Sequence, residues 1–308
     1  MHIIITGASG FIGRNLILGL PKSWRITALY HRSKDFPQFL KSHKISNVKA
    51  FSCDLSEGRD VRRLALKAGK RFDACVYLAA NGNPAVSVDH PLFDLQSNGI
   101  ALVNFLRYIQ IKRLIYFSSG AVYEGRKGKI APPMTLNPTL PYAISKYASE
   151  QYVKHFQKTG QVKEYGIVRF FGAYGPYEPG RKVYTNLVKT FFIERKNKFT
   201  VRGNGKNFID AMYVDDAVNA IFRIIKGQKK NFTVDCCSGT AVSINDLVRT
   251  AARVFKVKGL KIAHKGTVPE SNHFFASPRG MREYFGFHPL ISLEEGLKRF
   301  SEFLTEKS

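Results

Sequence analysis

The chain has 308 residues, of which 44% are hydrophobic and 13% aromatic, so its composition is that of a folded globular protein and excludes general disorder. It carries 48 lysine and arginine residues against 23 aspartate and glutamate residues, and the net charge of +25 would attract anionic partners. No apolar run approaches the roughly 20 residues of a membrane-spanning helix, an apolar strand pattern follows Met1 and His2 without room for a signal peptide, and the four cysteines lack metal-ligand spacing.

Basic residues are scattered along the chain, and neither zinc-finger spacing nor an aromatic RNA-binding signature accompanies them. The densest basic run, residues 58–71, has the pattern of a helix with a solvated basic face. We therefore disfavour a nucleic-acid partner and expect an anionic small-molecule substrate. The few cysteines fit a reducing cytoplasm, and we expect a cytoplasmic protein without membrane attachment.

The first half of the chain alternates short apolar runs with helical patterns. Strands are predicted at residues 2–7, 24–30, 48–54, 72–80, 112–119 and 164–172, and helices at residues 11–20, 58–71, 94–110 and 141–158. This alternation predicts an α/β fold with a doubly wound parallel sheet of the Rossmann type.

The pattern loosens beyond residue 172. A turn-rich loop spans residues 173–180, and helical patterns follow at residues 183–194, 214–226, 243–255 and 292–304. We predict a dinucleotide-binding Rossmann domain over residues 1–172, to which the chain returns around residues 208–236. Residues 173–207 and 237–308 are expected to form a smaller α+β substrate-binding lobe.

Three glycines stand between the first strand and the first helix. Gly7, Gly10 and Gly13 have G-x-x-G-x-x-G spacing in the segment IIITGASGFIG. Gly7 permits a tight turn, Gly10 lets the backbone approach a pyrophosphate, and Gly13 allows close packing of helix and strand. The position of the triplet at the start of a βαβ unit predicts a dinucleotide site.

The end of the second predicted strand bears on the choice of cofactor. NAD sites usually carry an acid about 20 residues after the glycines, where it bonds the ribose 2′-hydroxyl. Here the segment reads ALYHRSK, with His31, Arg32, Ser33 and Lys34 and no acid. Since Arg32 and Ser33 could hold a 2′-phosphate, we favour NADP(H) over NAD(H).

A tyrosine followed four residues later by a lysine occurs four times, so the spacing alone carries no information. The pairs are Tyr30/Lys34, Tyr108/Lys112, Tyr123/Lys127 and Tyr142/Lys146. Tyr142 differs from the other three because it opens a predicted helix and follows a strand that ends in Ser118 and Ser119.

Seven segments occur in the order known from one enzyme family. They are TGASGFIG (6–13), CDL (53–55), LAAN (78–81), SSGAVY (118–123), PYAISK (141–146), RFFGAYGP (169–176) and YVDDAVNA (213–220). Over nearly its whole length the sequence therefore resembles the extended short-chain dehydrogenase/reductase family, the epimerases, dehydratases and reductases of nucleotide sugars.

The resemblance implies roles for three side chains. Tyr142 would give or take a proton while a hydride moves to or from the nicotinamide. Lys146 would favour the tyrosine anion by its charge and bond the nicotinamide ribose, and Ser119 would orient the substrate oxygen, with Ser118 structural.

The glycine spacing, the second strand and the resemblance together predict the cofactor contacts. They are Gly7, Gly10, Phe11, Ile12, Gly13, His31, Arg32, Ser33, Asp54, Leu55, Ala79, Ala80, Asn81, Asn98, Tyr142, Lys146 and Phe170. A helix-packing role is the alternative for Asn98. No metal site is expected.

The sequence departs from the family pattern in its substrate contacts. Ser119 is followed by Gly120 and Ala121 where dehydratases usually carry Asp and Glu, which disfavours dehydration. Gly172 and Ile209 stand where the family usually has Asn and Arg, and residues 266–274 contain no Arg-Pro-Gly-Asp segment. The arginines that normally clamp a diphosphate are thus missing, and Arg181, Arg202, Lys206 and Lys265 could substitute for them.

We interpret the sequence as an NAD(P)-dependent enzyme of epimerase/reductase type that acts on a hydroxyl or ketone carbon, C4 by resemblance, of a nucleotide-activated sugar. A 4-epimerase with tightly retained NAD is an alternative. A non-catalytic cofactor-binding regulator or nucleic-acid binder is an alternative of another class, and the intact Ser119, Tyr142 and Lys146 set argues against it. A homodimer is compatible with each interpretation.

Overall fold

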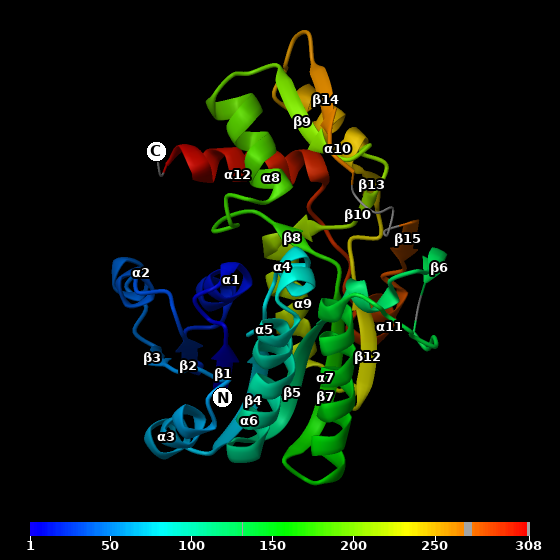
Figure 1. Cartoon of the computed structure of the whole chain (residues 1–308). Coiled ribbons are helices and arrows are strands. Elements are labelled where there is room, and N and C mark those ends of the chain that lie inside the picture. The colour runs from blue at the N-terminus through cyan, green and yellow to red at the C-terminus, as the bar shows by residue number, and fades with distance from the viewer. Residues whose placement is uncertain (131, 268–272, 307–308) are drawn as a thin grey trace. The chain divides into compact units, whose positions relative to one another are not determined.

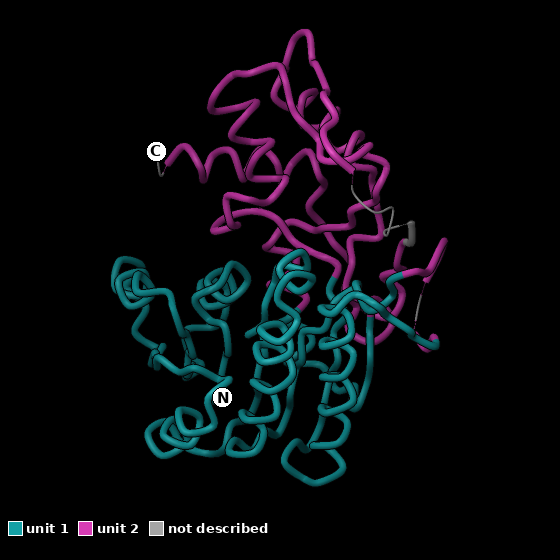
Figure 2. Tube along the Cα trace, viewed as in Figure 1, with its two compact units in different colours: residues 1–124, 135–170, 221–234 teal, residues 125–134, 171–220, 235–308 magenta. Residues whose placement is uncertain are grey.

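The protein is described by a computed structural model that covers residues 1–130, 132–267 and 273–306. The chain divides into two compact units (Figure 2). Unit 1 comprises residues 1–124, 135–170 and 221–234, and unit 2 comprises residues 125–134, 171–220 and 235–308.

Unit 1 is built on a seven-stranded sheet with the order β12-β7-β5-β4-β1-β2-β3. Its strands are β1 (His2–Thr6), β2 (Arg25–Tyr30), β3 (Val48–Ser52), β4 (Arg71–Tyr77), β5 (Gln110–Ser119), β7 (Val162–Phe170) and β12 (Phe232–Cys236). The pairs β1–β2, β1–β4, β2–β3, β4–β5 and β5–β7 are all parallel. Because the chain runs from the central β1 to one edge and then to the other, the predicted Rossmann-type sheet is confirmed.

Helices cover the sheet of unit 1. They are α1 (Phe11–Gly19), α2 (Phe36–Ser42), α3 (Gly58–Ala68), α4 (Pro84–Asp89), α5 (Pro91–Leu95), α6 (Ala101–Tyr108) and α7 (Pro141–Lys158), together with a 3₁₀ turn (Gly120–Tyr123) and the second half of α9 (Val214–Lys226). The single helix expected over residues 94–110 is instead α5, a π-helical turn (Gln96–Ile100) and α6. The apolar periodicity continues through this segment, so the sequence pattern did not reveal the extra residue of the π-helical turn. Such turns often occur at functional sites.

The sheet is buried on both faces. A core that includes Leu64, Phe105, Leu114 and Val153 joins α3, α6 and α7 to one face, and Figure 1 shows α6 and α7 in front of the strands. The second half of α9 also packs within unit 1, where the ring of Phe222 stacks on Trp24 with ring centroids 5.7 Å apart. Burial on both faces explains why the strands read as continuous apolar runs.

In its described residues, unit 2 contains four two-stranded sheets among helices. Its elements are β6 (Lys127–Ile130), β8 (Ala173–Tyr174), α8 (Val183–Val188), a π-helical turn (Lys189–Ile193), β9 (Lys198–Arg202), β10 (Phe208–Ile209), β11 (Met212–Tyr213), the first half of α9, β13 (Val242–Ser243), α10 (Ile244–Val254), β14 (Lys261–Lys265), β15 (His273–Ala276), α11 (Arg279–Phe285) and α12 (Leu293–Thr305). The pair β10–β13 is antiparallel, whereas β11–β8, β14–β9 and β15–β6 are parallel. Buried side chains of α8, α10 and α12, such as Leu187, Leu247 and Leu297, form its core.

Two absences hold for the residues that the structure covers. None of their helices is both long enough and apolar enough to cross a membrane. Nor do three or more histidine, cysteine, aspartate or glutamate side chains gather there in a way that could hold a metal ion.

Candidate active site

The turn between β1 and α1 is shaped for close backbone approach. Gly7 has φ +64, and a Cβ atom there would lie 2.9 Å from the backbone nitrogen of Ala79. A Cβ atom on Gly13 would lie 2.6 Å from the carbonyl oxygens of Gly7 and Ala8. Glycine is therefore required at both positions, and the turn brings the N-terminus of α1 to the edge of a pocket.

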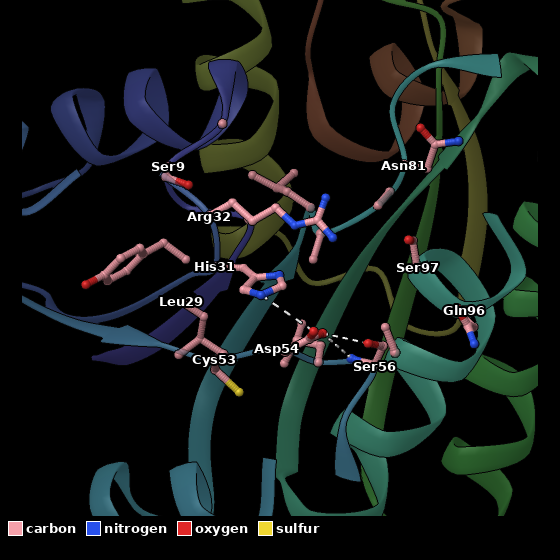
Figure 3. Close-up of a pocket in the computed structure, with 18 of the residues that line it drawn as sticks. Ser9, Leu29, His31, Arg32, Cys53, Asp54, Ser56, Asn81, Gln96 and Ser97 are labelled. Carbon is pink, nitrogen blue, oxygen red and sulfur yellow. Dashed lines mark hydrogen bonds and ion pairs between the residues drawn. The ribbon is translucent and has the colours of Figure 1, made fainter. Parts of the chain in front are cut away.

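That pocket, of about 430 Å³, lies within unit 1 (Figure 3). The predicted cofactor residues among its lining are Gly7, Gly10, His31, Arg32, Asp54, Leu55, Ala79, Ala80 and Asn81. Further lining comes from Ser9, Tyr30, Ser56, Phe93, Gln96 and Ser97, which the sequence did not single out. In Figure 3, Ser9, His31 and Arg32 lie on one side, and Asn81, Ser97 and Gln96 lie on the other. Segments far apart in the sequence thus converge at the carboxyl end of the sheet, where nucleotide ligands bind in open α/β sheets.

The other predicted cofactor residues lie elsewhere in unit 1. Phe11, Ile12 and Gly13 belong to α1, behind the glycine turn. Ser33 follows the pocket-lining Arg32, and its carbonyl oxygen accepts a hydrogen bond from the Phe36 N–H. Phe170 ends β7, where it is the register partner of Ser119 and its ring centroid lies 5.4 Å from that of Phe117.

Asp54 is the acid of the pocket. Its Oδ1 accepts hydrogen bonds from the Ser56 N–H at 2.9 Å and from the Ser56 hydroxyl at 2.7 Å, and His31 Nε2 lies 3.5 Å from its Oδ2. Partial burial alone would raise the pKa of Asp54, but these hydrogen bonds and the charges of His31 and Arg32 lower it on balance. Asp54 therefore presents a carboxylate to the pocket at neutral pH.

The three residues predicted to be catalytic lie where β5 ends and α7 begins. Ser119 is the last residue of β5 and accepts a hydrogen bond from the Ala121 N–H at 3.1 Å. Tyr142 occupies the first turn of α7, which starts at Pro141, and Lys146 follows one turn later on the same side. Tyr142 is 9% exposed and Lys146 is 3% exposed. The fold brings the three side chains together inside unit 1.

Burial sets the protonation states of the tyrosine and the lysine. Burial raises the pKa of Tyr142, the charge of Asp94 raises it further, and a hydrogen bond with Ser119 acts in the opposite direction. Burial lowers the pKa of Lys146 to about 8, against the charges of Glu150 and Asp94. The Lys146 ammonium donates a hydrogen bond of 2.5 Å to the carbonyl oxygen of Phe117, and it lies 4.7 Å from the ring centroid of Tyr116. The polypeptide by itself thus holds Tyr142 as a phenol.

A buried ion pair lies next to the catalytic residues, one helical turn after Lys146 on α7. Arg169 of β7 donates to both oxygens of Glu150 of α7, at 3.0 and 2.8 Å, and to the hydroxyl of Tyr123 at 2.9 Å. Ser118 donates to Glu150 at 2.6 Å, which is the structural role predicted for it. The pair ties α7 to β5 and β7.

A second buried cluster was not predicted from the sequence. The carboxylate of Asp94 accepts hydrogen bonds from Asn81, Asn98 and Ser145, and Asp94 is 0% exposed. Asn98 also accepts a 2.8 Å hydrogen bond from the Asn81 N–H, so it supports the pocket wall from behind. The helical pattern around residue 94 gave no sign that this acid is buried, because an aspartate in an amphipathic helix is usually on the solvated side.

Unit 2 holds Gly172, Ile209 and the segment of residues 266–274, which depart from the family pattern in the substrate contacts. Ile209 packs against the core of unit 2, and the neighbouring Asp210 accepts hydrogen bonds from the N–H groups of Ser238 and Gly239 at 2.6 and 3.3 Å. Arg181, Arg202, Lys206 and Lys265, the cations that could replace the missing arginines, are exposed. Residues 268–272 of the segment without the Arg-Pro-Gly-Asp motif lie outside the described residues.

Comparisons with known proteins agree with this geometry. A model of the NAD dependent epimerase/dehydratase family matches residues 3–235. The UDP-glucuronate 4-epimerase of Thermodesulfobacterium geofontis is 23% identical over 321 residues, which cover 97% of this chain and 94% of the relative.

Solved structures share the fold. A UDP-glucose 4-epimerase from Thermotoga maritima with UDP-glucose has a TM-score of 0.87 at 23% identity, covering 100% of this chain and 99% of that one. A UDP-glucuronic acid 4-epimerase from Bacillus cereus in complex with UDP-glucuronic acid and NAD has a TM-score of 0.87 at 21% identity, covering 100% of both chains.

The preference for NADP(H) predicted from the second strand is wrong. The matching family is NAD dependent, and similar solved structures are complexes that contain NAD. The physical reason is that a cation at the end of β2 does not require a phosphate. The guanidinium carbon of Arg32 lies 6.0 Å from the ring centroid of Phe93, and His31 faces Asp54.

Proposed function

Because the chain belongs to the NAD dependent epimerase/dehydratase family, we propose that it is a nucleotide-sugar 4-epimerase in which Tyr142 moves the proton. The UDP-sugar 4-epimerases with which it aligns along nearly its whole length support this choice. NAD is the cofactor, so the argument for an NADPH-consuming reductase no longer applies.

The observation that carries the proposal is the cluster of Ser119, Tyr142 and Lys146 at the junction of β5 and α7. A buried tyrosine with a serine on its hydroxyl side and a buried lysine one turn away is a costly arrangement for packing alone. None of the other three Tyr-x-x-x-Lys pairs opens a helix at the carboxyl end of the central strands.

The pocket of unit 1 fits a dinucleotide. The glycine turn would hold the pyrophosphate against the N-terminus of α1, because a side chain at Gly7 or Gly13 would collide with backbone atoms. Asp54, an acceptor on the pocket floor, would bind the adenosine end, and Asn81 would stand beside the nicotinamide ribose. When bound, NAD supplies a hydride acceptor and donor.

Side chains of the protein would carry out the proton transfer. With the positive nicotinamide and Lys146 beside it, Tyr142 would first release its phenolic proton to solvent; as the phenolate it would accept the proton of the sugar 4-hydroxyl as the C4 hydride leaves, and it would return that proton when the hydride is delivered to the opposite face of the ketone. Ser119 donates a hydrogen bond to the sugar oxygen and fixes its distance from the phenol. Lys146 places a positive charge beside the phenolate and so lowers the cost of forming it. The reaction has no net redox change.

Two features favour epimerisation over dehydration. The residues after Ser119 are Gly120 and Ala121, so no acid stands there to protonate a leaving hydroxyl at C6. In the described part of unit 1, the acids that act electrostatically on the catalytic pair are Asp94 and Glu150, and both are fully buried and engaged in hydrogen bonds.

The substrate is proposed to be an anionic nucleotide sugar. The net charge of +25 favours such an anion, and unit 2 carries exposed cations at Arg181, Arg202, Lys206 and Lys265. Arg202 and Lys265 are register partners on β9 and β14, so two of these charges lie side by side.

An isotope experiment tests the function. Purified protein with NAD is incubated in D₂O with UDP-glucose, UDP-N-acetylglucosamine or UDP-glucuronate, and the sugars are followed by proton NMR. We expect one of them to convert to its C4 epimer without deuterium at C4, since the hydride leaves and returns within one site. Conversion of none, or formation of a 4-keto-6-deoxy sugar, would overturn the proposal.

A further inference from the structure

Asp94 of α5 is a fully buried carboxylate whose hydrogen-bond donors are neutral. Its Oδ1 accepts from Asn81 Nδ2 at 2.8 Å and from Asn98 Nδ2 at 3.0 Å, and its Oδ2 accepts from the Ser145 hydroxyl at 2.5 Å. Amides and a hydroxyl satisfy the lone pairs of a carboxylate but carry no opposite charge. Burying such a charge is expensive, and a neutral side chain would serve the fold at lower cost.

The three donors come from the two halves of the proposed active site. Asn81 lines the cofactor pocket, and its backbone N–H donates a 2.8 Å hydrogen bond to Asn98 Oδ1. Ser145 directly precedes Lys146, and its hydroxyl lies 3.0 Å from the carbonyl oxygen of Tyr142. Asp94 therefore links the wall of the pocket to the first turn of α7.

The charge of Asp94 also acts on the catalytic pair. It raises the pKa of Lys146 against the larger effect of burial, together with Glu150, and it adds to the effect of burial in raising the pKa of Tyr142. Glu150 differs from Asp94 because it is bonded to the guanidinium of Arg169. Tyr116 of β5, a further titratable group that faces the cluster, has a pKa raised by burial and stays a neutral phenol.

We propose that Asp94 is a positioning residue for the reaction at Tyr142: its carboxylate joins the pocket wall at Asn81 to the first turn of α7 at Ser145, and its negative charge acts on the neighbouring Lys146. This inference rests on the proposed function for its link to catalysis. The charge helps Lys146 to remain an ammonium donor, and it does so although it also disfavours the phenolate of Tyr142.

The hydrogen-bond geometry offers a variant that removes the charge and keeps the cluster. In Asp94→Asn, the amide oxygen can accept from Asn81 and Asn98, while the amide N–H₂ donates to the Ser145 hydroxyl. That hydroxyl can then donate its single proton to the Tyr142 carbonyl oxygen, which already lies 3.0 Å away. Asp89→Asn is the matched control, because it removes the same charge from an exposed position at the end of α4.

The first measurement does not depend on turnover. Lysine side chains labelled with ¹³C are titrated by NMR in the cofactor-free protein, with the Lys146 signal assigned by its loss in Lys146→Met. We expect Asp94→Asn to lower the Lys146 pKa by about half to one unit, and Asp89→Asn to leave it unchanged. An unmoved titration in Asp94→Asn would overturn the proposed role of the charge.

The second measurement is the pH profile of kcat. In Asp94→Asn both limbs should move to lower pH by a similar amount, because both Tyr142 and Lys146 lose their proton more easily. A fall in kcat with an unchanged profile would show a packing role only and would contradict the proposal. If the lysine titration moves but wild-type protein converts no nucleotide sugar, the proposed function fails while the electrostatic role of Asp94 stands.

Discussion

Lys146 is 3% exposed, and its ammonium finds one carbonyl oxygen, that of Phe117, at 2.5 Å. Burial lowers its pKa to about 8, so the folded protein holds this proton more weakly than the unfolded chain does. Between pH 8 and the usual lysine pKa near 10.5, the unfolded chain binds more protons, and wild-type stability therefore rises with pH. Below pH 8 both states are protonated and the full cost of the buried charge is present.

It follows that Lys146→Met should stabilise the protein at pH 7 while abolishing its activity. Removing the buried charge should raise the free energy of unfolding by at most about 3 kcal/mol, and loss of the hydrogen bond to Phe117 should lower it by about 1 kcal/mol. The net increase in the free energy of unfolding is roughly 2 kcal/mol. The gain should shrink as pH rises from 8 towards 10. Urea unfolding of both proteins at pH 7 and pH 10 measures it, and a variant less stable than wild type at pH 7 would contradict the argument.

Helix α7 is held to the sheet by a charged contact as well as by apolar packing. Glu150 is 0% exposed and joins α7 to Arg169 of β7 and Ser118 of β5. It follows Lys146 by one turn of α7, and Ser118 directly precedes Ser119. Removing one partner of a buried pair leaves the other charge uncompensated. The contact therefore fixes the element that carries Tyr142 and Lys146.

Glu150→Ala should accordingly destabilise the protein by about 3–5 kcal/mol. Glu283→Ala is the control, since Glu283 forms an exposed pair with Arg279 at 2.6 Å and should cost much less, because exposed pairs contribute little to stability. Denaturant unfolding of the two variants against wild type decides the matter. Equal losses in both variants would mean that the buried pair adds nothing to the attachment of α7.

The elements also show how far the sequence could be read. The central strands were predictable because burial on both faces requires continuous apolar runs, and α9 was predicted with its observed bounds of Val214–Lys226. The two-residue strands β8, β10, β11 and β13 were not, since two residues carry no periodicity. Ser119, Tyr142 and Lys146 could be placed together by motif order, whereas Asp94 could not, because two of its three partners, Asn81 and Ser145, lie 13 and 51 residues away.

For the whole molecule, the excess of 48 basic over 23 acidic residues raises the question of its partner. A nucleotide sugar held in a specific site should feel this charge mainly as a long-range attraction, which salt screens beyond roughly 10 Å at 0.1 M. Nucleic acid held by many phosphate contacts would instead release counterions in proportion to their number.

The two cases separate in a salt titration. With NAD present, the affinity for the nucleotide sugar that turns over should weaken by less than about tenfold between 50 and 200 mM salt. Calorimetry with that sugar and with a duplex oligonucleotide provides the measurement. Tight oligonucleotide binding that falls by about 1,000-fold over the same range, with no binding of any nucleotide sugar, would assign the basic surface to nucleic acid.

The most direct test of the central claim removes one oxygen atom from Tyr142. Tyr142→Phe and Tyr108→Phe lose the same hydroxyl from two Tyr-x-x-x-Lys pairs, but only the first lies beside Ser119. Epimerisation of the nucleotide sugar is measured for both variants together with NAD affinity. Loss of the general acid and base should lower kcat by roughly 100- to 10,000-fold in Tyr142→Phe with NAD affinity nearly unchanged, and Tyr108→Phe should match wild type. Turnover by Tyr142→Phe within about tenfold of wild type would reject Tyr142 as the group that moves the proton.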